Sequence, residues 1–248
     1  MIGHPTFEDG RFVRPYLFLS ENVPDIFCDG ICGIISEAGG ISPDIIRLPS
    51  FDKLDFPVAS HPDMLVLPAG GRSLFVYREY YGMHRGVFDG KGFEVHMTDA
   101  APGKKYPSDI LLNFLIFGDS IIGRCDMLPP ELKALGLRPV TAKQGYARCS
   151  VCLADGCAIT ADKTLADILT GMGADVLLLS PGGVKLDGYD YGFIGGASIV
   201  YRNEIIFFGN PATHPDGERI AVFADRHGLK IHPLSDGELT DFGGGFVI

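Results

Sequence analysis

The chain has 248 residues, of which 46% are hydrophobic, and it carries a formal net charge of −10 at pH 7. Because nucleic-acid binding depends on clustered lysine and arginine, this acidic balance argues against a nucleic-acid-binding protein. No apolar run approaches the length of a membrane-spanning helix, and residues 1–9 have no signal-peptide pattern, so we expect a cytoplasmic protein that does not enter a membrane.

A unit of strand, strand, helix and strand recurs along the chain, at a spacing of roughly 40 to 50 residues that is typical of repeat proteins. The expected first strands, with their hairpin partners where these are present, are 16–19, 65–67 with 74–77, 110–117 with 120–122, 149–153 with 157–160, and 197–201 with 204–208. The hairpins turn at pairs such as Gly70-Gly71 and Asp155-Gly156, which favour tight turns.

Each unit then continues with an expected helix and a last strand. The helices are expected near 24–39, 79–88, 131–135, 162–171 and 216–224, and the last strands at 41–48, 93–97, 137–140, 174–179 and 229–234. The clearest helix is the fourth, which has Asp162 as its N-cap and Leu165, Ile168 and Leu169 on one stripe. A glycine stands before every last strand, as expected of a residue that closes a helix in the left-handed conformation.

These units predict an α/β fold, a five-bladed β/α-propeller of ββαβ repeats with pseudo-fivefold symmetry, in one domain over residues 1–248. The first unit has only one strand before its helix, and residues 240–248 resemble the strand that it lacks. We therefore expect strands from the two ends to pair and close the ring, which removes exposed sheet edges. An open α/β sheet is the alternative.

In such a ring, the residues just before each first strand form the mouth of a central pocket, and here they are polar. The candidate ligand-binding residues are His61, Asp63, Tyr106, Asp109, Lys143, Tyr146, Arg148, Tyr189, Tyr191 and Asp241. Asp63 and Asp109 both follow an X-Pro pair, which holds the preceding residue extended and favours an aimed carboxylate. The alternatives are that the two aspartates cap turns, that the tyrosines are core residues, and that Lys143 and Arg148 form a compensated structural cluster.

Three segments carry a family resemblance, namely 106–113, 143–150 and 188–198. They resemble an uncharacterised bacterial branch of the guanidine-modifying enzyme, or pentein, fold, which includes arginine and agmatine deiminases and dimethylarginine hydrolase. The resemblance implies acidic residues at Asp63 and Asp109. It also implies a catalytic histidine where this chain has Gly145-Tyr146-Ala147-Arg148, and a nucleophilic cysteine after the last glycine-rich strand, where this sequence reads Phe246-Val247-Ile248. A phenol, with an ordinary pKa of about 10, does not replace a histidine base near neutral pH.

Six cysteines are expected to be reduced, and only Cys149 and Cys152 have a spacing that suits a metal. Because no further ligand pair lies nearby and no phosphate loop follows the glycines, we expect neither metal nor cofactor. Cys149 lies beside Arg148 and near Lys143 in the sequence. Its role stays open: it could be a nucleophile, a core thiol, a redox-active thiol or a metal ligand. If residues 148–151 are a strand, alternation directs Arg148 and Cys149 to opposite faces.

Three functions remain open at this point: a small-molecule binding protein, a divergent guanidine-modifying hydrolase or amidinotransferase that uses His61, Asp63 and Asp109, and a structural or interaction protein. We favour ligand binding, because polar residues are retained at the predicted pocket. The aspartates suit a cationic guanidine or amine, while Lys143 and Arg148 suit a carboxylate, so together they indicate a ligand like an amino acid. The oligomeric state stays open.

Overall fold

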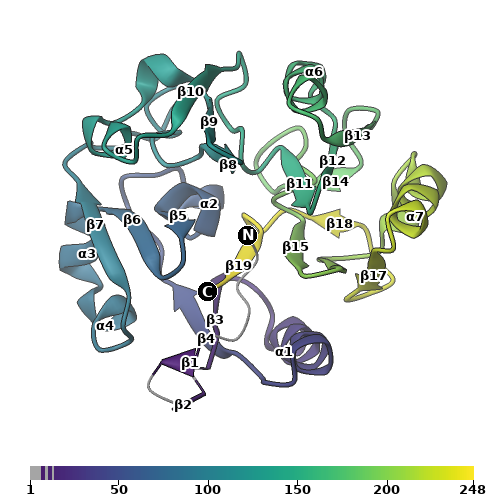
Figure 1. Cartoon of the computed structure of the whole chain (residues 1–248), viewed down its shortest axis with the longest axis horizontal. Helices are drawn as coiled ribbons and strands as arrows, with labels where there is room; N and C mark the ends of the chain where they lie inside the picture. The colour runs from purple at the N-terminus through teal and green to yellow at the C-terminus, as the bar shows by residue number, and fades with distance from the viewer. Residues whose placement is uncertain (1–6, 9–10, 13) are drawn as a thin grey trace.

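The computed structural model describes residues 7–8, 11–12 and 14–248. Most of residues 1–9, for which we expect no signal peptide, therefore lies outside the described residues. Figure 1 shows the five three-stranded sheets around a common centre, with most of the helices on the outside. A short antiparallel hairpin, β1 (Phe7–Glu8) and β2 (Arg11–Phe12), precedes them. In the part of the chain that is described, no helix is long and apolar enough to cross a membrane.

Each of the five sheets has three strands, and in each the inner pair is antiparallel and the outer pair parallel. From the inside outwards, the sheets are β19 (Gly245–Val247), β3 (Tyr16–Ser20) and β4 (Asp44–Leu48); β5 (Val66–Gly70), β6 (Ser73–Tyr77) and β7 (Glu94–Thr98); β8 (Leu115–Phe117), β9 (Ser120–Gly123) and β10 (Arg138–Thr141); β11 (Val151–Ala154), β12 (Cys157–Thr160) and β13 (Asp175–Leu178); and β15 (Ser198–Tyr201), β16 (Glu204–Phe207) and β17 (Lys230–Pro233).

Helices connect the two parallel strands of every sheet, as parallel pairing requires. They are α1 (Asp25–Gly39), α3 (Arg78–Met83) followed by α4 (Arg85–Phe88), α5 (Pro130–Lys133), α6 (Lys163–Gly171) and α7 (Gly217–Arg226). The Asp162 side chain caps α6 by accepting a hydrogen bond from the Leu165 amide at 2.8 Å, as predicted. The glycines that precede the outer strands all have positive φ, for example 79° at Gly40 and 93° at Gly173. The five mixed sheets with their helices confirm the α/β class.

Shorter elements lie between the sheets. They are α2 (Pro62–Leu65), the parallel pair β14 (Val184–Lys185) and β18 (Leu239–Thr240), and 3₁₀ turns at Phe56–Val58, Cys125–Met127 and Pro211–Thr213. The core consists of apolar side chains held between the sheets and the outer helices. Leu165 and Leu169 of α6, for example, are fully buried against Ile122 and Ala158 of two neighbouring sheets.

Three predicted elements differ from the structure. Residues 110–114 and 147–150 form buried turns rather than strands, so β8 begins at Leu115 and β11 at Val151. A largely apolar run does not distinguish a strand from a buried turn, which explains the error at 110–114. The expected helix 79–88 is broken at His84, whose φ of −126° and ψ of 36° separate α3 from α4.

Candidate functional site

A cavity of about 230 Å³ lies between α2, the turn at 147–150 and the segment that follows β14. Its lining combines acidic, aromatic and aliphatic side chains. The lining residues are Val58, His61, Asp63, Met64, Tyr146, Cys149, Leu186, Tyr189, Asp190, Tyr191, Phe193 and Asp241. These residues span more than 180 positions of the sequence, so only the tertiary fold brings them together. We call this the central cavity.

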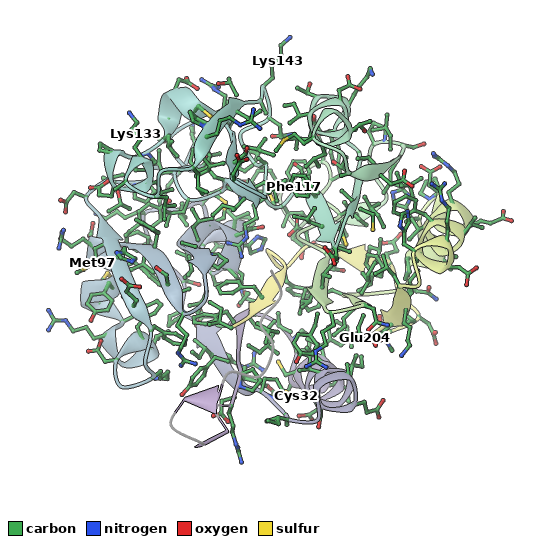
Figure 2. All side chains as sticks on the ribbon, in the orientation of Figure 1. Cys32, Met97, Phe117, Lys133, Lys143 and Glu204 are labelled. Carbon is green, nitrogen blue, oxygen red and sulfur yellow. The ribbon has the colours of Figure 1, made fainter. Side chains whose placement is uncertain are left out.

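The structure brings most of the predicted site residues to the central cavity, but not all of them. His61, Asp63, Tyr146, Tyr189, Tyr191, Asp241 and Cys149 line it. Lys143 does not, since it is exposed and lies at the outer edge of the molecule in Figure 2. Tyr106, Asp109 and Arg148 also do not line it; the first two lie behind Tyr146, and Arg148 lines a different cavity.

Asp63 lies at the wall of the cavity in the first turn of α2, directly after Pro62. Its side chain is almost completely buried, at 2% exposure, and neither carboxyl oxygen has a hydrogen-bond partner within the described part of the chain. Burial raises the pKa of Asp63 well above its ordinary value, and the charge of nearby Asp241 raises it further; the Arg148 guanidinium and the Cys149 thiol lower it, but they do not offset the burial. A buried carboxyl group without partners is uncommon, so it requires an explanation.

Asp241 and His61 are two further polar side chains in the wall of the central cavity. The two Asp241 carboxyl oxygens accept hydrogen bonds from the Gly243 and Phe193 amides, both at 2.8 Å, so this side chain joins two loops. Burial raises the pKa of Asp241 to about 6. His61 Nδ1 lies 3.7 Å from an Asp241 oxygen, which is too far for a good hydrogen bond, and burial lowers the pKa of His61 to about 3. The imidazole is therefore neutral.

Two tyrosines of the wall use their hydroxyl groups outside the cavity. Tyr146 donates a hydrogen bond to Asp109 at 2.6 Å, and Tyr189 donates to Asp55 at 3.0 Å. Burial and the bond to Asp109 raise the pKa of Tyr146 far above its ordinary value. The Tyr146 ring lies 5.8 Å from the Phe193 ring, measured between centroids. Asp109 thus acts on the cavity through Tyr146, although it is itself outside the lining.

The turn at 147–150 corrects the expectation that Arg148 and Cys149 alternate along a strand. Cys149 lines the central cavity, and both Cys149 and Arg148 line a second cavity of about 200 Å³ that the five inner strands surround. Asp63 also lines both cavities. The Arg148 guanidinium donates to the Val66 carbonyl and lies 4.9 Å from the centre of the Phe246 ring. Burial lowers the pKa of Arg148 to about 10.

Burial and the charges of Asp63 and Asp241 raise the pKa of the Cys149 thiol well above its usual value. The group in the cavity is therefore a thiol rather than a thiolate. The sequence suggested Arg148 and Lys143 as activating cations. The pKa of the thiol is raised although Arg148 is adjacent, and Lys143 is exposed to solvent. The six cysteines are free, and among the described residues no group of three or more histidine, cysteine, aspartate or glutamate side chains is arranged to hold a metal ion.

Sequence reasoning missed part of the site. Val58, Met64, Leu186, Asp190 and Phe193 line the cavity and were not predicted as binding residues. Asp190 and Phe193 stand in the polar aromatic segment around Tyr189 and Tyr191, which was the available signal. Asn113 was also missed: its side-chain oxygen accepts hydrogen bonds from the Arg148 and Cys149 amides at 2.9 and 3.2 Å, and so holds the turn in place.

Comparison with known proteins gives a family and a fold. The family described as "Family of unknown function (DUF6873)" matches residues 33–246, and no curated protein matches the chain. Among solved structures, dimethylarginine dimethylaminohydrolase from Pseudomonas aeruginosa, a variant complexed with citrulline, has a TM-score of 0.55 and 11% identity, over 96% of this chain and 100% of that chain.

Two further structures are similar at the same level. A dimethylarginine dimethylaminohydrolase adduct with S-methyl-L-thiocitrulline has a TM-score of 0.54 and 12% identity, over 96% of this chain and 100% of that one. An amidinotransferase from Microseira wollei, of a saxitoxin biosynthetic pathway, has a TM-score of 0.50 and 12% identity, over 87% of each chain. Identities this low show the fold alone, and that fold, as the sequence suggested, is the pentein fold.

Proposed function

The chain belongs to the DUF6873 family, and we propose that it binds a small organic cation, either a guanidino compound or an amine, in the central cavity. One solved structure of the same fold is a complex with citrulline, which supports a small-molecule site in this fold, although citrulline is a zwitterion with an uncharged ureido group and gives no support to a cation. We also propose that the five sheets are the blades of a single-domain propeller with pseudo-fivefold symmetry, closed by β3 and β19. In that arrangement the second cavity, which the five inner strands surround, lies on the axis, and the central cavity adjoins it through Asp63 and Cys149, which line both.

The observation that carries the proposal is the unpaired Asp63 carboxyl group. Leaving a buried polar group without hydrogen bonds is unfavourable by about 1 to 3 kcal/mol, and more when the group is charged. A guanidinium or ammonium ion entering the cavity would supply both donors and a compensating charge. The wall carries two further aspartates, Asp190 and Asp241, and neutral His61, so its charge is complementary to a cation.

The same geometry favours binding over catalysis. Attack on a guanidinium carbon requires a thiolate, and burial keeps Cys149 protonated. It also requires a group that accepts or donates protons near neutral pH. His61, with a pKa of about 3, is a weak base, and the pKa of Tyr146 is raised.

A second candidate function is a divergent guanidine-modifying enzyme in which Cys149 is the nucleophile. The observation in its favour is that Cys149, Asp63 and His61 line one cavity. In this case a bound ligand would have to lower the pKa of the thiol. The two candidates differ in whether a product is released.

The test is calorimetric titration with agmatine, together with an assay for released ammonia. We expect wild-type protein to bind without releasing ammonia, and Asp63→Asn to bind at least about tenfold more weakly because a charge-assisted pair is lost. Asp187→Asn is the matched control. Asp187 is an exposed carboxylate that pairs with Lys185, and it lies in the segment after β14 but is not in the cavity lining.

Equal affinity in wild type and Asp63→Asn would refute the proposed site. Ammonia release that Cys149→Ser abolishes would support the enzyme instead.

A further inference from the structure

We infer that the ligand of the central cavity is an organic cation that carries no carboxylate group, so that free amino acids are poor ligands. This inference rests on the proposed function and narrows it to one class of compound. It replaces the amino-acid-like ligand that the sequence indicated. The reason is that aspartates line the cavity, while Lys143 and Arg148 do not.

No lysine or arginine is among the residues that line the central cavity in the described part of the chain. The two basic residues that were expected to hold a carboxylate are elsewhere. Lys143 points to solvent at the outer edge (Figure 2). Arg148 lines the second cavity, where its guanidinium donates to the Val66 carbonyl and lies against the Phe246 ring.

Arg124, which lies close to the wall through its hydrogen bond to Tyr106, is not free to pair with a ligand. Tyr106, whose ring centroid lies 5.7 Å from that of Tyr146, accepts a hydrogen bond from Arg124. Arg124 in turn donates to both carboxyl oxygens of Asp126, at 2.8 and 2.6 Å. The positive charge of Arg124 is therefore compensated where it stands.

The carboxyl groups that are present offer a bound carboxylate no positive partner, and each of them that is ionised repels it. Asp63, Asp190 and Asp241 line the cavity, and His61 beside them is neutral. An anion that loses its hydration among carboxyl groups, with no cation to pair with, is strongly disfavoured. The same three side chains attract a cation.

The remaining wall suits an aliphatic stem. Val58, Met64, Leu186 and Phe193 are apolar, and the hydroxyl groups of Tyr146 and Tyr189 are already bonded to Asp109 and Asp55. These two tyrosines therefore contribute ring surface more than hydrogen bonds, and aromatic surface attracts organic cations. The ligand class is thus an amine or guanidine on a hydrocarbon chain.

Agmatine and arginine test this directly, because arginine is agmatine with an added carboxylate. We expect agmatine to bind at least about tenfold more tightly than arginine in calorimetric titration at pH 7.5. Arginine methyl ester, which keeps the added bulk without the negative charge, should bind more tightly than arginine. Arginine binding as tightly as agmatine would overturn the inference and leave the proposed function standing. If none of the three binds, the proposed function itself fails.

A charge reversal gives a second, independent measurement. Asp190 is exposed at the cavity, so Asp190→Arg is compatible with folding and places a cation in the lining. We expect this variant to bind arginine more tightly and agmatine more weakly than wild type, while Asp187→Arg, outside the cavity, leaves the ratio unchanged. If Arg148→Gln, verified as folded by its melting curve, weakens arginine but not agmatine, then Arg148 does hold a carboxylate and the inference is wrong.

Discussion

At the scale of single residues, buried Asp63 links the stability of the protein to pH, and it would link the proposed ligand binding to pH as well. Its pKa is about 3.8 in an unfolded chain and is raised in the folded protein by burial and by Asp241. The folded state therefore holds this proton more tightly than the unfolded state does. As a result, the contribution of Asp63 to the free energy of unfolding decreases as pH rises from the unfolded pKa through the folded pKa. A bound cation would favour the ionised form and release the proton.

Asp63→Asn should therefore be more stable than wild type at pH 8, by on the order of 1 kcal/mol, because it removes a carboxyl group that folding keeps from ionising. The difference should vanish as pH falls below about 4, where both states of wild type are protonated. Urea unfolding at a series of pH values measures it. His61, whose low pKa of about 3 destabilises the acidified protein, is common to both proteins and cancels in the comparison.

Asp187→Asn should follow wild type at every pH, because Asp187 is exposed. A stability difference between Asp63→Asn and wild type that does not change with pH would mean that Asp63 is already ionised in the folded state, for example through Arg148.

At the scale of elements, the turn at 147–150 depends on a single side chain from another segment. Asn113 is fully buried, and its oxygen accepts both the Arg148 and the Cys149 amides. Its amide nitrogen lies 3.3 Å from the Met64 sulfur and 3.5 Å from the Cys149 sulfur. One residue thus connects the loop before β8, the helix α2 and the turn that carries Cys149.

Asn113→Ala should destabilise the protein by about 2 to 4 kcal/mol, because two buried amides lose their acceptor. It should also expose Cys149, so alkylation of that thiol by iodoacetamide, located by mass spectrometry, should become faster than in wild type. Asn203→Ala, in the exposed β15–β16 turn, is the control and should change neither quantity. Unchanged alkylation of Cys149 together with lower stability would show that the turn keeps its shape without Asn113.

The local signals in the sequence predicted those elements whose cause is local. Gly70-Gly71 and Asp155-Gly156 do turn hairpins, and Asp162 does cap α6. The turn at 147–150 was missed because Asn113, the acceptor for its Arg148 and Cys149 amides, is distant in sequence. For the same reason, the sequence grouped Lys143 and Arg148 with the aspartates. Nothing near either residue in the chain indicates that one points to solvent and the other into a second cavity.

At the scale of the whole molecule, the last strand, β19, joins the sheet formed by β3 and β4. β19 pairs with β3 in antiparallel register, and the Ile248 amide and carbonyl exchange hydrogen bonds with Tyr16 at 2.9 and 2.6 Å. The Phe246 ring stacks on Phe18, with centroids 4.7 Å apart and planes 9° apart. Without β19, the inner edge of β3 and the Phe18 ring would be exposed, as would the inner wall of the second cavity.

Deleting residues 245–248 should therefore lower the midpoint of thermal unfolding by at least about 10 °C, or cause aggregation, because it exposes an apolar sheet edge. This deletion keeps Asp241 and Gly243, so the hydrogen bonds of Asp241 to the Phe193 and Gly243 amides are retained in the wall of the central cavity. A synthetic peptide of residues 241–248 should restore part of the lost stability if strand pairing with β3 is the cause. Phe56→Ala, which removes a ring that is 84% exposed, is the control and should melt with wild type. A truncated protein that melts with the full-length protein would show that β19 does not close the ring.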